Sequence, residues 1–214
     1  MVMNDLLFKA LYETLLMVFG STGIGILLGV PVGVILYNTS QQGLQPCKKV
    51  YGPLSFLVNG ARSIPYIILT VLLIPFTRNI IGTSIGTGSA IVPLSIAATL
   101  LIARCVEDAL RSVPKGLSEV GISFGATPFE IIRKILLPES MAPLIAGITT
   151  VIINLVGYSA MAGTVGGGGL GDLAIRYGYQ RYDTVLVVLI VVILVILVQC
   201  IQMLGQRCAN HYRR

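Results

Sequence analysis

The sequence has few charged residues, a single histidine and no tryptophan. Only 11% of its 214 residues are charged and 55% are hydrophobic, whereas about a quarter of the residues in a typical soluble domain carry a charge. No long polar stretch occurs, so we expect no second, soluble domain. This shortage of charge indicates that most of the protein surface faces lipid.

Motifs for hydrolytic, redox and metal chemistry are also missing. No Walker-type phosphate loop (glycine, four residues, Gly-Lys, then Ser or Thr) is present, so the chain is not expected to hydrolyse ATP. The single histidine, His211, lies in the C-terminal tail, and the four cysteines form no CxxC pair. Gly166, Gly168 and Gly171 have the spacing of a dinucleotide-binding fingerprint, but they follow an apolar helical segment and no β-strand, so a flexible or tight turn is expected. The sequence therefore predicts no cofactor, metal or catalytic residue.

The nine acidic residues are all expected in loops or at the ends of membrane spans. They are Asp5, Glu13, Glu107, Asp108, Glu119, Glu130, Glu139, Asp172 and Asp183. Ion-coupled secondary transporters usually carry ionisable groups inside the membrane. A stand-alone secondary transporter is therefore a weaker interpretation than a transporter driven by a partner protein, and a membrane enzyme is weaker still.

Five apolar stretches are candidates to cross a bilayer, which takes about 20 helical residues. They cover about residues 14–36, 54–76, 89–103, 140–165 and 184–204. The sequence thus predicts an all-α, polytopic membrane protein in which residues 1–214 form one transmembrane domain. The second stretch is interrupted by the run Arg62-Ser63-Ile64-Pro65, and we interpret Arg62 as lying near the cytoplasmic interface.

Small residues recur every four positions in the first span, at Ser21, Gly25, Gly29 and Gly33. Such a stripe allows a neighbouring helix to approach closely. We therefore assign Gly25, Gly29 and Gly33 to helix packing in preference to substrate contact.

One charged passage, at about residues 107–138, separates two of the apolar stretches. Gly125 stands where a left-handed residue would end a short helix. Thr127, Pro128 and Glu130 follow as a capping box with proline in the first helical position. The passage therefore predicts a helix-turn-helix loop.

These residues resemble the Glu-Ala-Ala loop of ABC-importer permeases. The resemblance rests on Glu119, on Gly125 six residues later and on the Ile-Leu-Leu-Pro run at residues 135–138. Val120 and Gly121 stand where that loop has its two alanines. In that family the loop is cytoplasmic and docks into a cleft on a separate ATPase subunit. The resemblance implies a type I importer permease with these ATPase-coupling residues: Glu119, Gly125, Ala126, Thr127, Pro128, Leu137 and Pro138.

Three further passages are similar to the methionine-importer permeases of bacterial ABC systems. They lie at residues 62–69, 74–86 and 155–171. This resemblance implies a homodimer of the chain, two cytoplasmic ATPase subunits that bind the ATP, and a periplasmic or lipid-anchored methionine-binding protein. The solute would be methionine, carried by alternating access. A permease for another small amino acid or an osmoprotectant remains the alternative.

The basic residues support an orientation in the bacterial inner membrane. The net charge of +6 could suggest nucleic acid, but the cations lie in segments beside the apolar spans and fit the positive-inside rule better. With the charged passage inside the cell, ten cations are cytoplasmic: Lys48, Lys49, Arg104, Arg111, Lys115, Arg133, Lys134, Arg207, Arg213 and Arg214. Four are outside: Lys9, Arg78, Arg176 and Arg181. This count predicts a periplasmic N-terminus and a cytoplasmic C-terminus.

A polar patch in the fourth span precedes the glycine-rich turn. We hypothesise that Tyr158, Ser159 and Met161 line the translocation path or its outer gate. The alternative is a helix-packing notch formed by Gly157 and Ser159.

Overall fold

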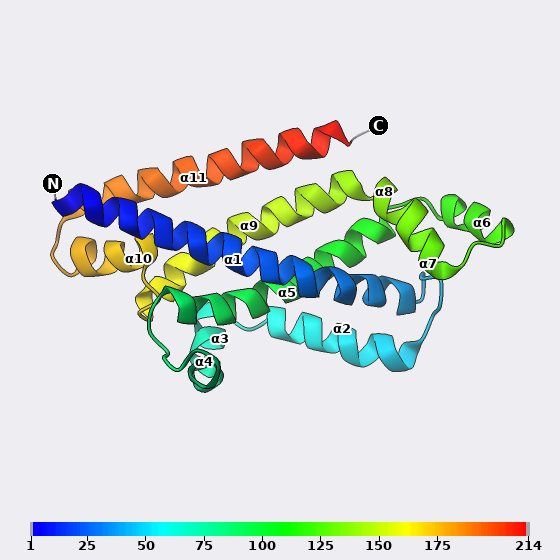
Figure 1. Ribbon diagram of the computed structural model, residues 1–214, viewed down its shortest axis with the longest axis horizontal. Helices are drawn as coiled ribbons and strands as arrows, with labels where there is room; N and C mark the ends of the chain where they lie inside the picture. The colour runs from blue at the N-terminus through cyan, green and yellow to red at the C-terminus, as the bar shows by residue number, and fades with distance from the viewer. Residues whose placement is uncertain (1, 213–214) are drawn as a thin grey trace.

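The computed structural model describes residues 2–212, and these residues form helices and connecting turns without a β-strand (Figure 1). The elements are α1 (Val2–Thr39), α2 (Lys48–Arg62), α3 (Tyr66–Leu72), α4 (Ile74–Ile81), α5 (Thr87–Arg111), α6 (Lys115–Ser123), α7 (Pro128–Ile131), the π-helical η1 (Ile132–Leu136), α8 (Leu137–Glu139), α9 (Met141–Thr164), α10 (Gly169–Leu173), the π-helical η2 (Ala174–Tyr179) and α11 (Thr184–His211). The expected all-α class is confirmed.

Four of the helices are long and apolar enough to cross a membrane. They are Asp5–Thr39, Thr87–Arg111, Met141–Thr164 and Thr184–His211, and they correspond to four of the five expected spans. The third expected span, at residues 89–103, is longer than the sequence suggested because α5 continues to Arg111.

The second expected span, at residues 54–76, is not one helix. It is broken after Arg62, and α3 begins only after Pro65. Proline donates no backbone hydrogen bond and disfavours helical geometry in the residue before it, which accounts for the break. Figure 1 shows the α2–α3 break near the middle of the long axis, deeper than the interfacial position expected for Arg62.

The small-residue stripe of α1 packs on α5. A Cβ built on Gly25 would lie 2.6 Å from the Cβ of Ala98, and one on Gly29 would lie 2.7 Å from the carbonyl oxygen of Thr99. A Cβ on Gly33 would collide with the carbonyl oxygen of Ala103. The backbones of α1 and α5 are thus close enough to exclude any side chain at these three positions.

The glycine-rich turn anchors α10 onto α1. The carboxylate of Glu13 accepts a hydrogen bond from the Gly169 N–H at 2.8 Å, and the Thr14 hydroxyl accepts one from the Leu170 N–H at 2.9 Å. Gly168 and Gly169 have φ values of 81° and 78°, which an L side chain rarely adopts. The turn is therefore a tight junction held by side chains of α1.

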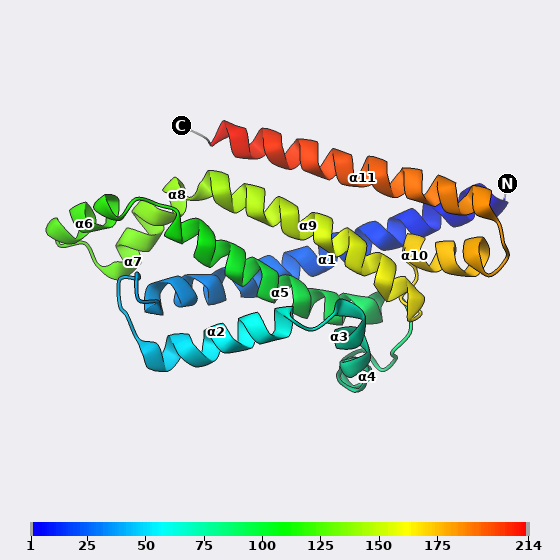
Figure 2. The same cartoon turned by 180° about the vertical axis from the view of Figure 1, so that it is seen from behind.

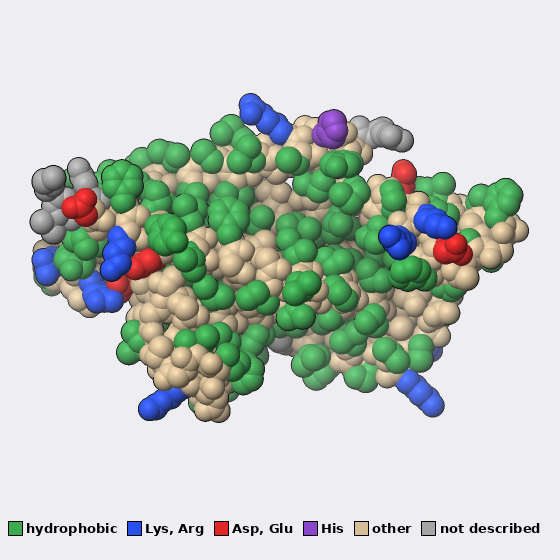
Figure 3. Space-filling view, viewed as in Figure 1, with side chains coloured by type: hydrophobic (Ala, Val, Ile, Leu, Met, Phe, Trp, Pro, Cys, Tyr) green, Lys and Arg blue, Asp and Glu red, His purple; other side chains and the backbone are tan. Residues whose placement is uncertain are grey.

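Charged side chains are distributed in keeping with a membrane band. On the face shown in Figure 3, Lys, Arg, Asp and Glu gather mainly toward the two ends of the long axis, and the middle is mostly hydrophobic. One end carries the N-terminus and α10, and the other carries α6 to α8; the reverse view in Figure 2 shows the same arrangement. Arg213 and Arg214, which were counted among the cytoplasmic cations, lie outside the described residues.

Candidate coupling loop and membrane cavity

The predicted helix-turn-helix projects from one end of the molecule (Figure 2). Helix α6 ends in a Schellman motif, in which the Gly125 N–H donates to the Ile122 carbonyl at 2.9 Å and the Ala126 N–H donates to the Gly121 carbonyl at 3.1 Å. Gly125 has a φ of 75°. The left-handed glycine expected from the sequence is confirmed.

The capping box of α7 is also formed. The Glu130 N–H donates to the Thr127 hydroxyl at 3.3 Å, and the Glu130 carboxylate accepts from the Thr127 N–H at 3.1 Å. Lys134 binds the other carboxylate oxygen at 3.0 Å. The hydrogen bond from Lys134, followed by those from Thr127, lowers the pKa of Glu130 from 4.5 to about 2. The loop therefore has a fixed shape at neutral pH.

The outer surface of the loop carries two large exposed aromatic side chains and an exposed acid on α6. Phe124 is 87% exposed and Phe129 is 68% exposed, and Glu119 is exposed on α6. Large aromatic side chains are seldom left in water without a partner, and they are common at the centres of protein interfaces. This surface has the composition of a docking site.

Gly121, one of the two departures from the alanines of the family loop, lies under α7 and η1. A Cβ at this position would be 3.0 Å from the Ile135 Cδ1 and 3.1 Å from the Ile131 Cγ1. An alanine would therefore require these isoleucines to shift. The glycine permits closer packing between the two halves of the loop, while Val120 is 54% exposed.

The last two of the predicted coupling residues lead directly into α9. Leu137 is partly buried and Pro138 is exposed, and the Ser140 hydroxyl donates to the Leu137 carbonyl at 3.1 Å. The preceding segment, η1, is π-helical. No irregular loop intervenes, so a displacement of α7 would be transmitted to α9.

A buried ion-pair network lies at the end of α5, directly before the loop. The side chain of Glu107 is fully buried, and its two oxygens lie 2.7 Å from Arg104 and 2.6 Å from Arg111. The Tyr51 hydroxyl donates to the same carboxylate at 3.2 Å, which joins α2 to α5. Glu107 was expected at a span end, where the loop begins. The spacing of Arg104, Glu107 and Arg111 by three and four residues could have indicated a continuing helix.

The structure does not bring the three candidate path residues onto one surface. Tyr158 stacks on Tyr66 with ring centroids 4.6 Å apart, and Met161 is 46% exposed. Ser159 is buried, and its hydroxyl donates to the Val156 carbonyl at 2.7 Å. Ser159 therefore packs inside the subunit, whereas Gly157, its partner in the helix-packing alternative, is exposed and has nothing within 4 Å of an added Cβ.

A cavity of about 390 Å³ opens between α5 and α9 below the stacked tyrosines. Its polar lining comes from Arg62, Arg104, Asp108, Thr150 and Asn154. A smaller cavity of about 30 Å³ separates it from the tyrosine pair, and Arg62 and Leu101 line both. The position of Arg62 within an apolar stretch is visible in the sequence, but its neighbours in the cavity come from distant segments, so no role could be assigned to it from the sequence.

Comparisons with known proteins agree with this architecture. The family model described as "Binding-protein-dependent transport system inner membrane component" matches residues 25–207. A probable D-methionine transport system permease protein of Vibrio cholerae is 50% identical over 202 residues, covering 94% of this chain and 90% of its own length. A D-methionine transport system permease protein of Escherichia coli is 51% identical over 158 residues, covering 74% and 73% of the two chains.

Solved structures give the same result for the fold. A chain from a structure of the MetNI methionine ABC transporter in inward facing conformations superposes with a TM-score of 0.97 at 48% identity, covering 99% of this chain and 98% of that one. A chain of an amino acid ABC transporter solved with histidines has a TM-score of 0.79 at 21% identity, covering 97% and 94%. The second likeness concerns the fold alone.

Proposed function

Because the chain belongs to the family of binding-protein-dependent transport system inner membrane components, we propose that it is the permease subunit of an ATP-driven methionine importer. It carries methionine across the bacterial inner membrane by alternating access. The observation that carries this proposal is the likeness to the MetNI methionine transporter over nearly the whole of both chains. The relatives named for D-methionine extend the proposal to both enantiomers.

In this proposal the chain does not hydrolyse ATP, and a partner ATPase binds and hydrolyses the nucleotide. The ATPase docks on the outer surface of α6 and α7. Glu119 meets a basic residue of the ATPase, and the apolar side chains of Phe124 and Phe129 enter its cleft. Closure of the ATPase then moves the loop as a rigid body. Because η1 connects the loop to α9, this movement also rotates α9.

In this proposal the chain crosses the membrane five times, because α2 and α3 together count as one broken span. The N-terminus is then periplasmic, and the C-terminus lies on the side of the coupling loop, in the cytoplasm. Two copies of the chain form the transporter with two ATPase subunits, and a methionine-binding protein delivers the solute from the periplasm. The apolar exposed faces of α9 and α11 provide surfaces for the second copy and for lipid.

The outer end of the path is assigned to the stacked pair of Tyr66 and Tyr158. The pair closes the space above the cavity, and Met161 extends the same helix beyond it. We retain Tyr158 and Met161 as gate or path residues. Ser159 is left out because its side chain packs inside the subunit.

Copurification and uptake test the function together. Wild-type chain should copurify with an ATPase from native membranes and support methionine uptake in proteoliposomes. Glu119→Lys should reduce both ATPase association and uptake without preventing membrane insertion, because it reverses the charge on the docking surface. Lys115→Gln, which changes a charge elsewhere on α6, is the matched control. Normal copurification and transport by Glu119→Lys would remove the coupling assignment.

A further inference from the structure

We infer that Arg62 binds the carboxylate of the transported amino acid in the cavity between α5 and α9. The inference rests on the proposed function and adds a solute-binding residue within the membrane. It follows from the depth of Arg62, from the charge balance around it and from the lining of the cavity.

Arg62 lies deep in the molecule for a cation. It is the last residue of α2, and fourteen residues separate it from Lys48 at the start of that helix, which corresponds to about 21 Å of helix rise. A charge at such depth is costly unless it faces protein or water, and it usually marks a substrate or ion pathway. Arg62 is exposed and lines the cavity, so its guanidinium is accessible to a solute.

The other charges near the cavity balance one another. Arg104 lies 2.7 Å from Glu107 and 3.5 Å from Asp108, and Arg111 lies 2.6 Å from Glu107. These four groups contribute two cations and two carboxylates. Within residues 2–212, Arg62 forms no ion pair with a described side chain. The cavity therefore has one unbalanced positive charge, and a guanidinium is well suited to bind a carboxylate.

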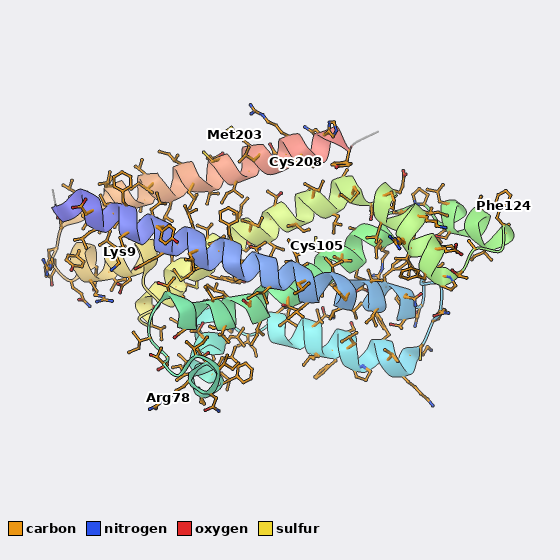
Figure 4. The ribbon with its side chains drawn as sticks, viewed as in Figure 1. Lys9, Arg78, Cys105, Phe124, Met203 and Cys208 are labelled. Atoms are coloured by element: carbon orange, nitrogen blue, oxygen red, sulfur yellow. The ribbon has the colours of Figure 1, made fainter. Side chains whose placement is uncertain are left out.

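The remaining lining fits a small zwitterion with an apolar side chain. The volume of about 390 Å³ lies at the lower end of the range of about 300–1,000 Å³ typical of small-molecule sites. Asn154 and Thr150 provide side-chain oxygens that can accept hydrogen bonds from the ammonium group. Leu101, Val151 and Pro143 provide apolar contacts. Figure 4 labels Cys105, another lining residue, near the middle of the bundle and away from both ends.

Uptake kinetics give the first test, with the ATPase and binding protein present in proteoliposomes. Arg62→Gln should lower the maximal rate of methionine uptake about tenfold or more, because it removes a charge-assisted hydrogen bond. Arg62→Lys should retain more activity because it keeps the charge. The KM should change little, since the binding protein captures the solute. Arg78→Gln is the control, because Arg78 lies on α4 (Figure 4) and does not line the cavity.

Protection from alkylation tests binding without transport. In a chain whose native cysteines are replaced by alanine, Thr150→Cys places a thiol on the cavity wall. Methionine should slow its reaction with a maleimide in the purified complex, whereas methioninol, which lacks the carboxylate, should not. The addition of Arg62→Gln should abolish the protection by methionine.

The outcomes separate the two proposals. A wild-type complex without methionine uptake would refute the proposed function. A complex that transports methionine but shows equal protection by methionine and methioninol, or full activity with Arg62→Gln, would overturn the role of Arg62. If Arg62→Gln fails to assemble, Arg62→Lys takes its place: protection by methionine as strong as in the Arg62 chain would overturn the role of the guanidinium, and weaker protection would support it.

Discussion

Glu107 is a fully buried carboxylate at the point where α5 meets the coupling loop. Two arginines of the same helix and the Tyr51 hydroxyl of α2 share its oxygens. A buried charge is tolerated only when its partners remain in place. This residue therefore fixes the end of α5 against α2, beneath the surface proposed to receive the ATPase.

Replacing Glu107 by Gln should destabilise the protein by about 1–3 kcal/mol, because Arg104 and Arg111 lose their shared counter-ion but remain partly exposed to solvent. Thermal unfolding in detergent measures this change. Asp108→Asn is the matched control, since that side chain is 59% exposed and exposed pairs contribute about 0–1 kcal/mol. Equal losses in the two variants would show that the network contributes no more than a surface pair.

Glu130 gives the loop a defined pH response. Its pKa is lowered from 4.5 to about 2 by Lys134 and Thr127, so the folded loop favours the carboxylate form. The resulting stabilisation is fully present above pH 4.5 and is lost as the pH falls toward 2.

Hydrogen exchange measured on residues 126–136, corrected for the intrinsic pH dependence, should therefore show constant protection of α7 between pH 7 and about pH 5. Glu130→Gln should exchange faster at pH 7, since the charge pairing with Lys134 is gone, and should show no change of protection on acidification to pH 3. A loss of wild-type protection already at pH 6 would contradict the lowered pKa.

At the scale of elements, the contact between α1 and α5 depends on the absence of side chains. Gly33→Ala should destabilise the protein by about 1–3 kcal/mol, because the added methyl group collides with the backbone of α5. Gly23→Ala lies on the same helix, where an added Cβ meets nothing within 4 Å, and should be neutral or stabilising by up to about 1 kcal/mol. Thermal unfolding of both variants measures the difference, and similar behaviour would refute the packing role.

The elements differ in how far they could be predicted from the sequence. The caps of the coupling loop were predictable because Gly125, Thr127 and Glu130 act through contacts within a few residues. The interruption of the second span at residues 62–65 was visible in the sequence, but hydropathy shows an apolar stretch on both sides of Pro65 and could not show that the helix ends there. The length of α5 was underestimated because its last residues are charged and were therefore taken for a loop. In the structure these charges pair with one another, so the helix continues through them.

The membrane cavity could not be predicted, because its lining comes from α2, α5 and α9, whose relative positions depend on the whole fold. The relative placement of Tyr158, Ser159 and Met161 could not be predicted for a related reason. These residues are near neighbours in sequence, but successive positions on a helix face different directions. Only the structure shows that Ser159 faces the interior and Tyr158 faces Tyr66.

At the scale of the whole molecule, the energy source follows from the proposed partnership with an ATPase. Glu13 accepts a hydrogen bond from the Gly169 N–H and Glu107 pairs with two arginines, so both carboxylates have structural partners within the subunit. Methionine uptake in proteoliposomes that contain the ATPase should therefore require ATP and be blocked by vanadate. A protonophore should have no effect at constant ATP. Uptake abolished by the protonophore would favour a secondary transporter.

The anchoring of α10 on α1 also has a consequence for biosynthesis. The hydrogen bonds from Gly169 and Leu170 to Glu13 and Thr14 join positions 156 residues apart. Chains are made from the N-terminus, and contacts between distant positions form late in folding. The stripe of α1 can pack on α5 once about half of the chain has been synthesised, but the polar partners of Glu13 and Thr14 do not yet exist. Helix α1 therefore leaves the ribosome first but forms its polar contacts late. Until the second half of the chain has been synthesised, packing on α5 must hold α1 in place.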